Sequence, residues 1–272
     1  KLILSISNQK ILEDKEEIKA FLQLILSISN NHYRVLNFFI KIKKIINYLK
    51  NYLKQFLSNS ELIDIFRNNK VLLLYLIEIN IIFIDKTNFN VFLIQNDKVS
   101  KYDHFFYPQY KKFITKEQQE EIEKEILYTS DIFNEKCHIG ENDSYICNLI
   151  RNDSIDKFIS FINQTNISLS SQISKSVFET NSFLLKKKDT TLIEYAAFFG
   201  SISIFKYLMF NNVKLTNSLW LYAIHSNNAE LISLIEENKV DIKSYNEIIE
   251  ESISCHHNNL TDYFLNNTAK NK

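Results

Sequence analysis

The chain has 272 residues, of which 45% are hydrophobic and 24% are charged, and its formal net charge is zero. This balance is typical of a folded protein and excludes a global electrostatic attraction to nucleic acid or to an anionic membrane. It contains two glycines and one proline. Phosphate-binding loops, dinucleotide fingerprints and nucleophile elbows need at least two glycines in one short window, so these motifs are excluded.

The three cysteines, Cys137, Cys147 and Cys255, are too few and too scattered for a secreted disulfide framework. They predict a reducing, intracellular location, and we expect the cytoplasm. No stretch has the length and cleavage site of a signal peptide. The most apolar run, residues 71–84, is interrupted by polar residues and is too short to span a membrane. Because the chain begins with Lys1 and its only methionine lies far inside, we expect an amino-terminal segment before it.

Two long amphipathic helices are predicted at the start of the chain, over residues 11–28 and 33–57. The second carries a series of lysines from Lys41 to Lys54 between its apolar positions. A solvated helix face is the interpretation that we favour for this series. The alternative is a helix that docks on nucleic acid or on acidic lipid.

Residues 60–80 form two short apolar stretches separated by an Asn-Asn pair, and Ser60 is the predicted N-cap of the first stretch. The segment 85–114 has poor helical regularity. It contains an aromatic cluster at residues 104–108, HFFYP, which we expect to pack as a connector onto the helices. An exposed docking patch is the alternative for this cluster.

A charged helix follows, and its start is marked by a capping box between Thr115 and Gln118. Gly140 is the expected C-cap or turn residue just beyond it. We place the domain boundary between Asn134 and Asp143. The prediction is therefore a helical amino-terminal domain of unknown function over residues 1–135, and a repeat domain over 142–272.

The carboxy-terminal half contains an internal repeat, seen by aligning residues 195–212, 222–238 and 251–267. Each unit reads as a short helix, a polar break, a second helix and an Asn-rich loop. Corresponding positions of the three units lie 27 and then 29 residues apart; one such set is Ala196, Ala223 and Ser252. Repetition at this period is typical of a solenoid, because a single hairpin cannot bury its apolar face alone.

Gly200 is predicted to occupy the turn between the two helices of its hairpin, in the left-handed conformation that glycine adopts at low cost. Asn227 and His256 are the equivalent residues of the next two units, and both residue types are found there more often than most. Ala196 and Ala197 are small, which predicts a close approach of the first helix to its neighbours.

The segment TLIEYAAFFGSISIFKYL resembles the ankyrin repeat pattern, with matches at Thr191, Ile193, Ala196, Ala197, Gly200, Ile204 and Leu208. It departs from the pattern at Leu192 and Glu194, where proline and histidine are expected, and its loop is shorter. Residues 146–267 resemble a large group of divergent protist proteins that couple an uncharacterised helical domain to ankyrin-like repeats. The resemblance implies an all-α fold: an ankyrin-like solenoid of helical hairpins behind an irregular helical amino-terminal part.

The sequence predicts no catalytic, cofactor or metal site. The soft-ligand candidates are Cys137-His138, Cys147 and Cys255-His256-His257, but neighbours on a helix point in different directions and rarely bind one metal together. A Cys–His nucleophile pair across repeats is conceivable without supporting context. An enzyme would instead be indicated by a cleft that gathers a cysteine, a histidine and a carboxylate.

The resemblance implies that the protein is a non-catalytic scaffold that binds a protein partner through the concave face of its repeats. The partner-binding positions are the two residues before each turn: Phe198, Phe199, His225, Ser226, Ser254 and Cys255. Phe198 or Phe199 could instead be covered by the segment 168–185. The alternative function is a structural or membrane-peripheral module that docks through the Lys41–Lys54 helix.

Overall fold

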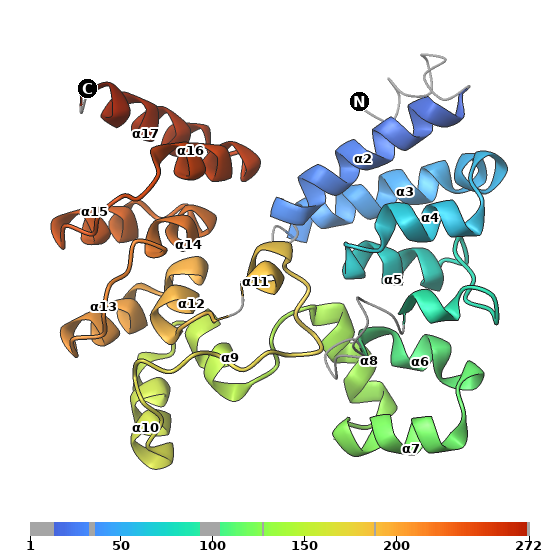
Figure 1. Cartoon of the computed structure of the whole chain (residues 1–272), viewed down its shortest axis with the longest axis horizontal. Helices are drawn as coiled ribbons and strands as arrows, with labels where there is room; N and C mark the ends of the chain where they lie inside the picture. Colours follow the sequence, from blue (N-terminus) through green and yellow to red (C-terminus); the bar gives the residue numbers. More distant parts are fainter. Residues whose placement is uncertain (1–13, 33–35, 93–103, 127, 188, 271–272) are drawn as a thin grey trace. The chain divides into compact units, whose positions relative to one another are not determined.

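The computed structural model describes residues 14–32, 36–92, 104–126, 128–187 and 189–270, and these are almost entirely helical. They form sixteen α-helices, α2 to α17, three short 3-10 helices and one isolated β-bridge, with no strand (Figure 1). The predicted all-α class is therefore confirmed.

The contacts within the chain define two compact units. The first extends to Glu141 and also includes Lys175–Lys186; the second comprises Asn142–Ser174 and Lys187–Lys272. The change between Glu141 and Asn142 falls within the expected boundary region. The predicted division at one boundary does not account for Lys175–Lys186, which follow that boundary in the sequence but belong to the first unit.

The first unit begins with four helices around a core of large apolar side chains. Leu22, Ile46 and Phe66 are all 0% exposed. The N-cap of the third of these helices is Ser58, which forms a capping box with Glu61, so the prediction of Ser60 is wrong by half a turn. The helices are α2 (Lys15–His32), α3 (Leu36–Phe56), α4 (Asn59–Phe66) and α5 (Lys70–Glu78).

The aromatic cluster at 104–108 packs into the first unit, as expected for a connector. Phe105, Phe106 and Tyr107 are 1%, 6% and 6% exposed, and the first two rings meet edge to face. These residues lie among the short elements η1 (Phe89–Phe92), η2 (His104–Phe106), α6 (Tyr107–Tyr110) and η3 (Lys111–Phe113).

The predicted N-cap at Thr115 and C-cap at Gly140 are confirmed, but the single charged helix predicted between them is wrong, because one helix ends at Glu125 and a separate helix begins at Ser130. Thr115 and Gln118 form the capping box of α7 (Lys116–Glu125). Gly140 caps the end of α8 (Ser130–Ile139) with φ 69°, and its carbonyl accepts a hydrogen bond from Thr180 Oγ1 at 2.7 Å. A Cβ at Gly140 would lie 2.9 Å from the same hydroxyl, so glycine is needed for space as well as for conformation. The remaining helix of this unit is α11 (Ser182–Lys186).

The second unit consists of four helical hairpins, which follow one another in chain order (Figure 1). The first helix of each hairpin packs against the first helix of the next, so α9 contacts α12, α12 contacts α14 and α14 contacts α16. The hairpins are α9 (Tyr145–Arg151) with α10 (Ile155–Thr165), α12 (Leu192–Phe199) with α13 (Ile202–Phe210), α14 (Leu219–Ser226) with α15 (Ala229–Glu237), and α16 (Tyr245–Ser254) with α17 (Asn258–Lys270).

Small residues allow this close packing of the first helices. Ala196, Ala197, Ala223 and Ser252 are all 0% exposed. A larger side chain at any of them would separate neighbouring helices and open gaps in a dense interior.

Each hairpin turn contains a residue with positive φ, as the sequence predicts for three of them. The φ angles are 70° at Gly200, 49° at Asn227 and 56° at His256, and Asp153 in the first hairpin has 45°. A Cβ at Gly200 would lie 3.2 Å from the Cβ of Ser226 in the next hairpin. The rare glycine is therefore used where left-handed backbone meets a neighbouring helix.

Polar side chains link one hairpin to the next. The carboxylate of Asp153 accepts hydrogen bonds from the main-chain N–H groups of Ser203 and Ile204, each at 3.0 Å. Glu194 caps its own helix through Thr191 and accepts a hydrogen bond from Ser218 Oγ, at the start of the next hairpin, at 2.5 Å. The glutamate that departs from the ankyrin pattern thus joins α12 to α14.

Candidate functional site

The six predicted partner-binding residues lie at the carboxy-terminal ends of three successive first helices. Phe198 and Phe199 end α12, His225 and Ser226 end α14, and Ser254 ends α16 with Cys255 as its C-cap. The recurrent turn geometry places these ends at equivalent positions in their hairpins.

The six residues differ in their access to solvent. Phe198 is 0% exposed and Cys255 is 1% exposed, so both belong to the interior. The ring of Phe198 packs on the His225 ring, with centroids 4.8 Å apart, and edge to face on Phe199. Phe199 and Ser226 are half-buried and Ser254 is exposed. A partner could therefore reach Phe199, Ser226 and Ser254, but not Phe198 or Cys255.

The segment 168–185, suspected of covering Phe198, forms backbone hydrogen bonds with residues at the other end of α12. Ile173 N–H donates to Thr190 O at 2.8 Å, and Leu192 N–H donates to Ser171 O at 3.1 Å. These hydrogen bonds lie at the amino-terminal end of the helix. Phe198 is buried at the opposite end, where its ring packs against the next hairpin.

A histidine, a carboxylate and a thiol meet between α14 and α16. His225 Nε2 lies 2.9 Å from Glu251 Oε1, and Cys255 Sγ lies 3.5 Å from His225 Nδ1 and 4.0 Å from Glu251 Oε1. Glu251 and Cys255 are four residues apart and so share one face of α16. The sequence predicts His225 and Cys255 as partner-binding residues but gives no role to Glu251, for which the available signal is the Glu-x-x-x-Cys spacing on a predicted helix.

The cluster contains the residue types expected of a thiol nucleophile with its base and orienting acid. Its burial argues against catalysis in this conformation. The His225 side chain is 4% exposed, that of Glu251 is 27% exposed, and Cys255 is 1% exposed. A substrate cannot reach the sulfur without opening the contact between α14 and α16.

Cys137 and His138 diverge, as expected for neighbours on a helix. Cys137 is 3% exposed and its thiol donates to Phe105 O at 3.5 Å. Burial raises the pKa of this thiol to about 12, so the reactive thiolate is scarce at neutral pH. The His138 side chain is exposed, and its Nε2 atom lies 2.7 Å from Glu78 Oε1.

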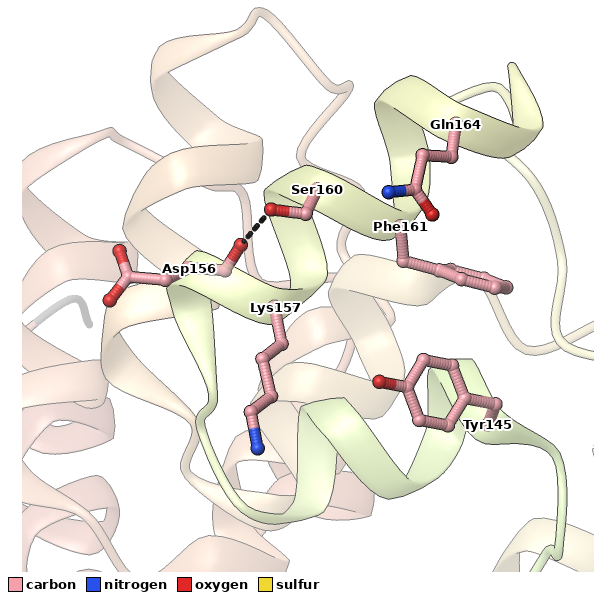
Figure 2. A pocket seen from close by; sticks show the side chains of 6 residues that line it. All are labelled: Tyr145, Asp156, Lys157, Ser160, Phe161 and Gln164. Atoms are coloured by element: carbon pink, nitrogen blue, oxygen red, sulfur yellow. Dashed lines mark hydrogen bonds between the residues drawn. The ribbon is translucent and has the colours of Figure 1, made fainter.

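A shallow pocket of about 260 Å³ lies on the first hairpin of the second unit (Figure 2). The rings of Tyr145 and Phe161 meet edge to face at 5.1 Å, and Ser160 Oγ donates to the main-chain oxygen of Asp156 at 2.9 Å. The charged ends of Asp156 and Lys157 point apart in Figure 2, so the pocket does not concentrate one sign of charge. Its lining residues are Tyr145, Asp156, Lys157, Ser160, Phe161 and Gln164.

Several lysines of the Lys41–Lys54 series are engaged within the first unit. Lys43 Nζ lies 4.9 Å from the ring centroid of Tyr75, and Lys50 donates to Ile79 O at 2.6 Å. Lys54 lies over the ring of Phe83 at 5.6 Å. These contacts hold the ammonium groups close to the protein surface.

Comparison of the chain with protein-family models, curated proteins and solved structures finds no match. Among the helices that the structure describes, none combines the length and the apolar character needed to cross a membrane.

Proposed function

We propose that the second unit is an ankyrin-like repeat solenoid and that the protein is a non-catalytic scaffold that binds a protein partner. The observation that carries this proposal is the succession of four hairpins whose first helices pack side by side and end in equivalent positive-φ turns. Stacked hairpins present the ends of several helices as one extended surface, which is how solenoids recognise partners.

The accessible part of this surface defines the kind of contact that we propose. Phe199 offers part of an aromatic ring, and the end of α16 offers the Ser254 hydroxyl beside Ile253, which is 55% exposed. Aromatic side chains dominate the energy of protein interfaces, and hydroxyl groups there contribute adaptable hydrogen bonds. Phe199 is thus the proposed anchor of the interface.

The burial of the His225–Glu251–Cys255 cluster supports the non-catalytic part of the proposal, because the sulfur is shielded from substrates. The membrane-peripheral alternative is less well supported. Docking on acidic lipid needs free cationic side chains, whereas Lys43, Lys50 and Lys54 already contact rings or a carbonyl of their own unit.

Site-specific photo-crosslinking tests the proposal. A photoreactive phenylalanine analogue is placed at Phe199, or as the matched control at Phe210, which is 74% exposed at the end of α13. In extracts of the source cells we expect one discrete cross-linked protein from position 199, and its loss when unlabelled chain competes. Equal cross-linking from both positions, or none from position 199, would contradict a recognition surface at the ends of the first helices.

A further inference from the structure

The His225–Glu251–Cys255 cluster has the composition and spacing of a metal site. We propose that these three residues bind a Zn²⁺ ion between α14 and α16. This goes beyond the scaffold function and does not depend on it. Zn²⁺ takes imidazole nitrogen, carboxylate oxygen and thiolate sulfur as ligands, and the cluster supplies one of each.

The distances between the ligand atoms already approach those of a tetrahedral site. Zn–N and Zn–O bonds of about 2.0–2.1 Å and a Zn–S bond of about 2.3 Å require ligand atoms about 3.3–3.6 Å apart. Here His225 Nε2 lies 2.9 Å from Glu251 Oε1 and 4.0 Å from Cys255 Sγ, and the oxygen lies 4.0 Å from the sulfur. Each separation is within about 0.7 Å of the tetrahedral value. The sulfur lies nearer to His225 Nδ1, at 3.5 Å, than to Nε2, so a zinc ion bound to Nε2 requires the Cys255 thiol to rotate toward the Nε2 side of the ring.

The ligands come from helix positions that packing holds in place. Glu251 and Cys255 lie one turn apart on α16, and the ring of His225 is stacked on Phe198. Zinc enters when the Cys255 thiol gives its proton to solvent and His225 keeps its proton on Nδ1, which leaves Nε2 free to bind the metal. The Glu251 side chain is 27% exposed, and a water molecule on that side completes the four ligands.

Such an ion would fasten the third hairpin to the fourth. Both Ser226 and Ser254 directly adjoin ligands of the site in the sequence. The bound metal would therefore fix the relative positions of two of the three helix ends that form the proposed recognition surface. Without it, the contacts between the two helices at this point include the 2.9 Å contact between His225 and Glu251.

Titration with Co²⁺, a spectroscopic substitute for Zn²⁺, tests the site in the full chain under reducing conditions. The chain is first stripped with a chelator. We expect one equivalent of Co²⁺ to produce a thiolate-to-metal charge-transfer band that one equivalent of Zn²⁺ removes. The band should be lost in Cys255→Ser and kept in the matched control Cys147→Ser, since Cys147 is equally buried but lies outside the cluster.

Two further measurements test the zinc site if Cys255→Ser folds poorly. Glu251→Gln leaves the thiol intact and should weaken Co²⁺ binding at least tenfold, while circular dichroism of the metal-free chain stays unchanged. Zinc at a hundredfold excess over its Kd should raise the Tm of the wild-type chain by about 5–10 °C. A wild-type chain with no charge-transfer band, or a band that survives in Cys255→Ser, would overturn the proposal.

Discussion

The interiors of the two units of this chain differ in kind. The first unit is held by one connected cluster of large apolar side chains, which extends from Ile18 in α2 to Phe178. The second unit repeats a local arrangement, with small residues between first helices and polar links such as Asp153 and Glu194 between neighbouring hairpins. A single shared core is expected to unfold as a whole. In an array of repeats, the stability is approximately the sum of the stabilities of the repeats and of the interfaces between neighbouring repeats.

Removal of a buried aromatic ring should produce the largest loss of stability. The residues whose amide exchange then accelerates should show which helices share each interior. Phe66 in the first unit and Phe198 in the second are both 0% exposed. We expect Phe66→Ala and Phe198→Ala each to cost about 3–5 kcal/mol of unfolding free energy. Amide hydrogen exchange should accelerate throughout the first unit in Phe66→Ala, but most strongly in α12 and α14 in Phe198→Ala.

The matched control for Phe198 is its half-buried neighbour. Phe199→Ala should cost about 1 kcal/mol, because a ring that keeps contact with solvent loses less on truncation. It should also weaken partner capture, as proposed for the anchor of the interface. A large loss of Tm in Phe199→Ala would place this ring in the core and remove it from the recognition surface.

Substitutions of the turn residues should have effects of intermediate size on stability. Gly200→Ala should destabilise by about 1–2 kcal/mol, because the left-handed conformation is costly for alanine and the new methyl group meets Ser226. Asn227→Gly should be neutral or slightly stabilising, since that turn also has positive φ. Thermal unfolding monitored by circular dichroism measures both changes. Equal destabilisation by the two substitutions would argue against shared turn geometry.

The polar link between hairpins should contribute less than a turn or a ring. Glu194→Gln keeps the size of the side chain but replaces the charged carboxylate, whose oxygens accept hydrogen bonds from Thr191 and Ser218, with a neutral amide. We expect a loss of about 1 kcal/mol in chemical denaturation. Ser218→Ala should cost no more than that, and the double variant should cost less than the sum of the two. Additive losses would indicate that the two residues are not coupled.

The smallest predicted effect is a pH dependence in the first unit. Hydrogen bonding from Lys15 and from the backbone of Ser58 lowers the pKa of Glu61 from its usual 4.5 to about 2. Its stabilising contribution is therefore complete above about pH 4.5 and is lost as the pH falls toward 2. Glu61→Gln should flatten the acid limb of the Tm-against-pH curve. An unchanged acid limb would show that this exposed pair contributes nothing measurable.

Local features of the fold could be predicted from the sequence, whereas features that depend on packing could not. Gly200, Asn227 and His256 can be predicted from the sequence because a turn needs a residue that accepts positive φ, and this is a property of the residue itself. Ser58 and Ser60 are both plausible caps from their type alone, and only the backbone decides between them.

The candidate site depended more on packing. The positions before each turn lie at the ends of the first helices, but which of them face solvent depends on the neighbouring hairpin, as for the buried Phe198 and Cys255. Glu251 acquires its role only when α16 packs on α14 and brings its carboxylate to His225. The membership of residues 175–186 in the first unit is likewise a long-range property.

The central claim is that the second unit is a stack of hairpins, each stabilised by its neighbours. Phe264 in the last hairpin is 0% exposed and packs edge to face on Trp220 of the third, so Phe264→Ala perturbs one end of the stack. Residue-resolved amide exchange of this variant should show a loss of protection that is largest in α16 and α17, smaller in α14 and absent in α9. An equal loss of protection in all four hairpins would contradict the stack and, with it, the proposed recognition surface.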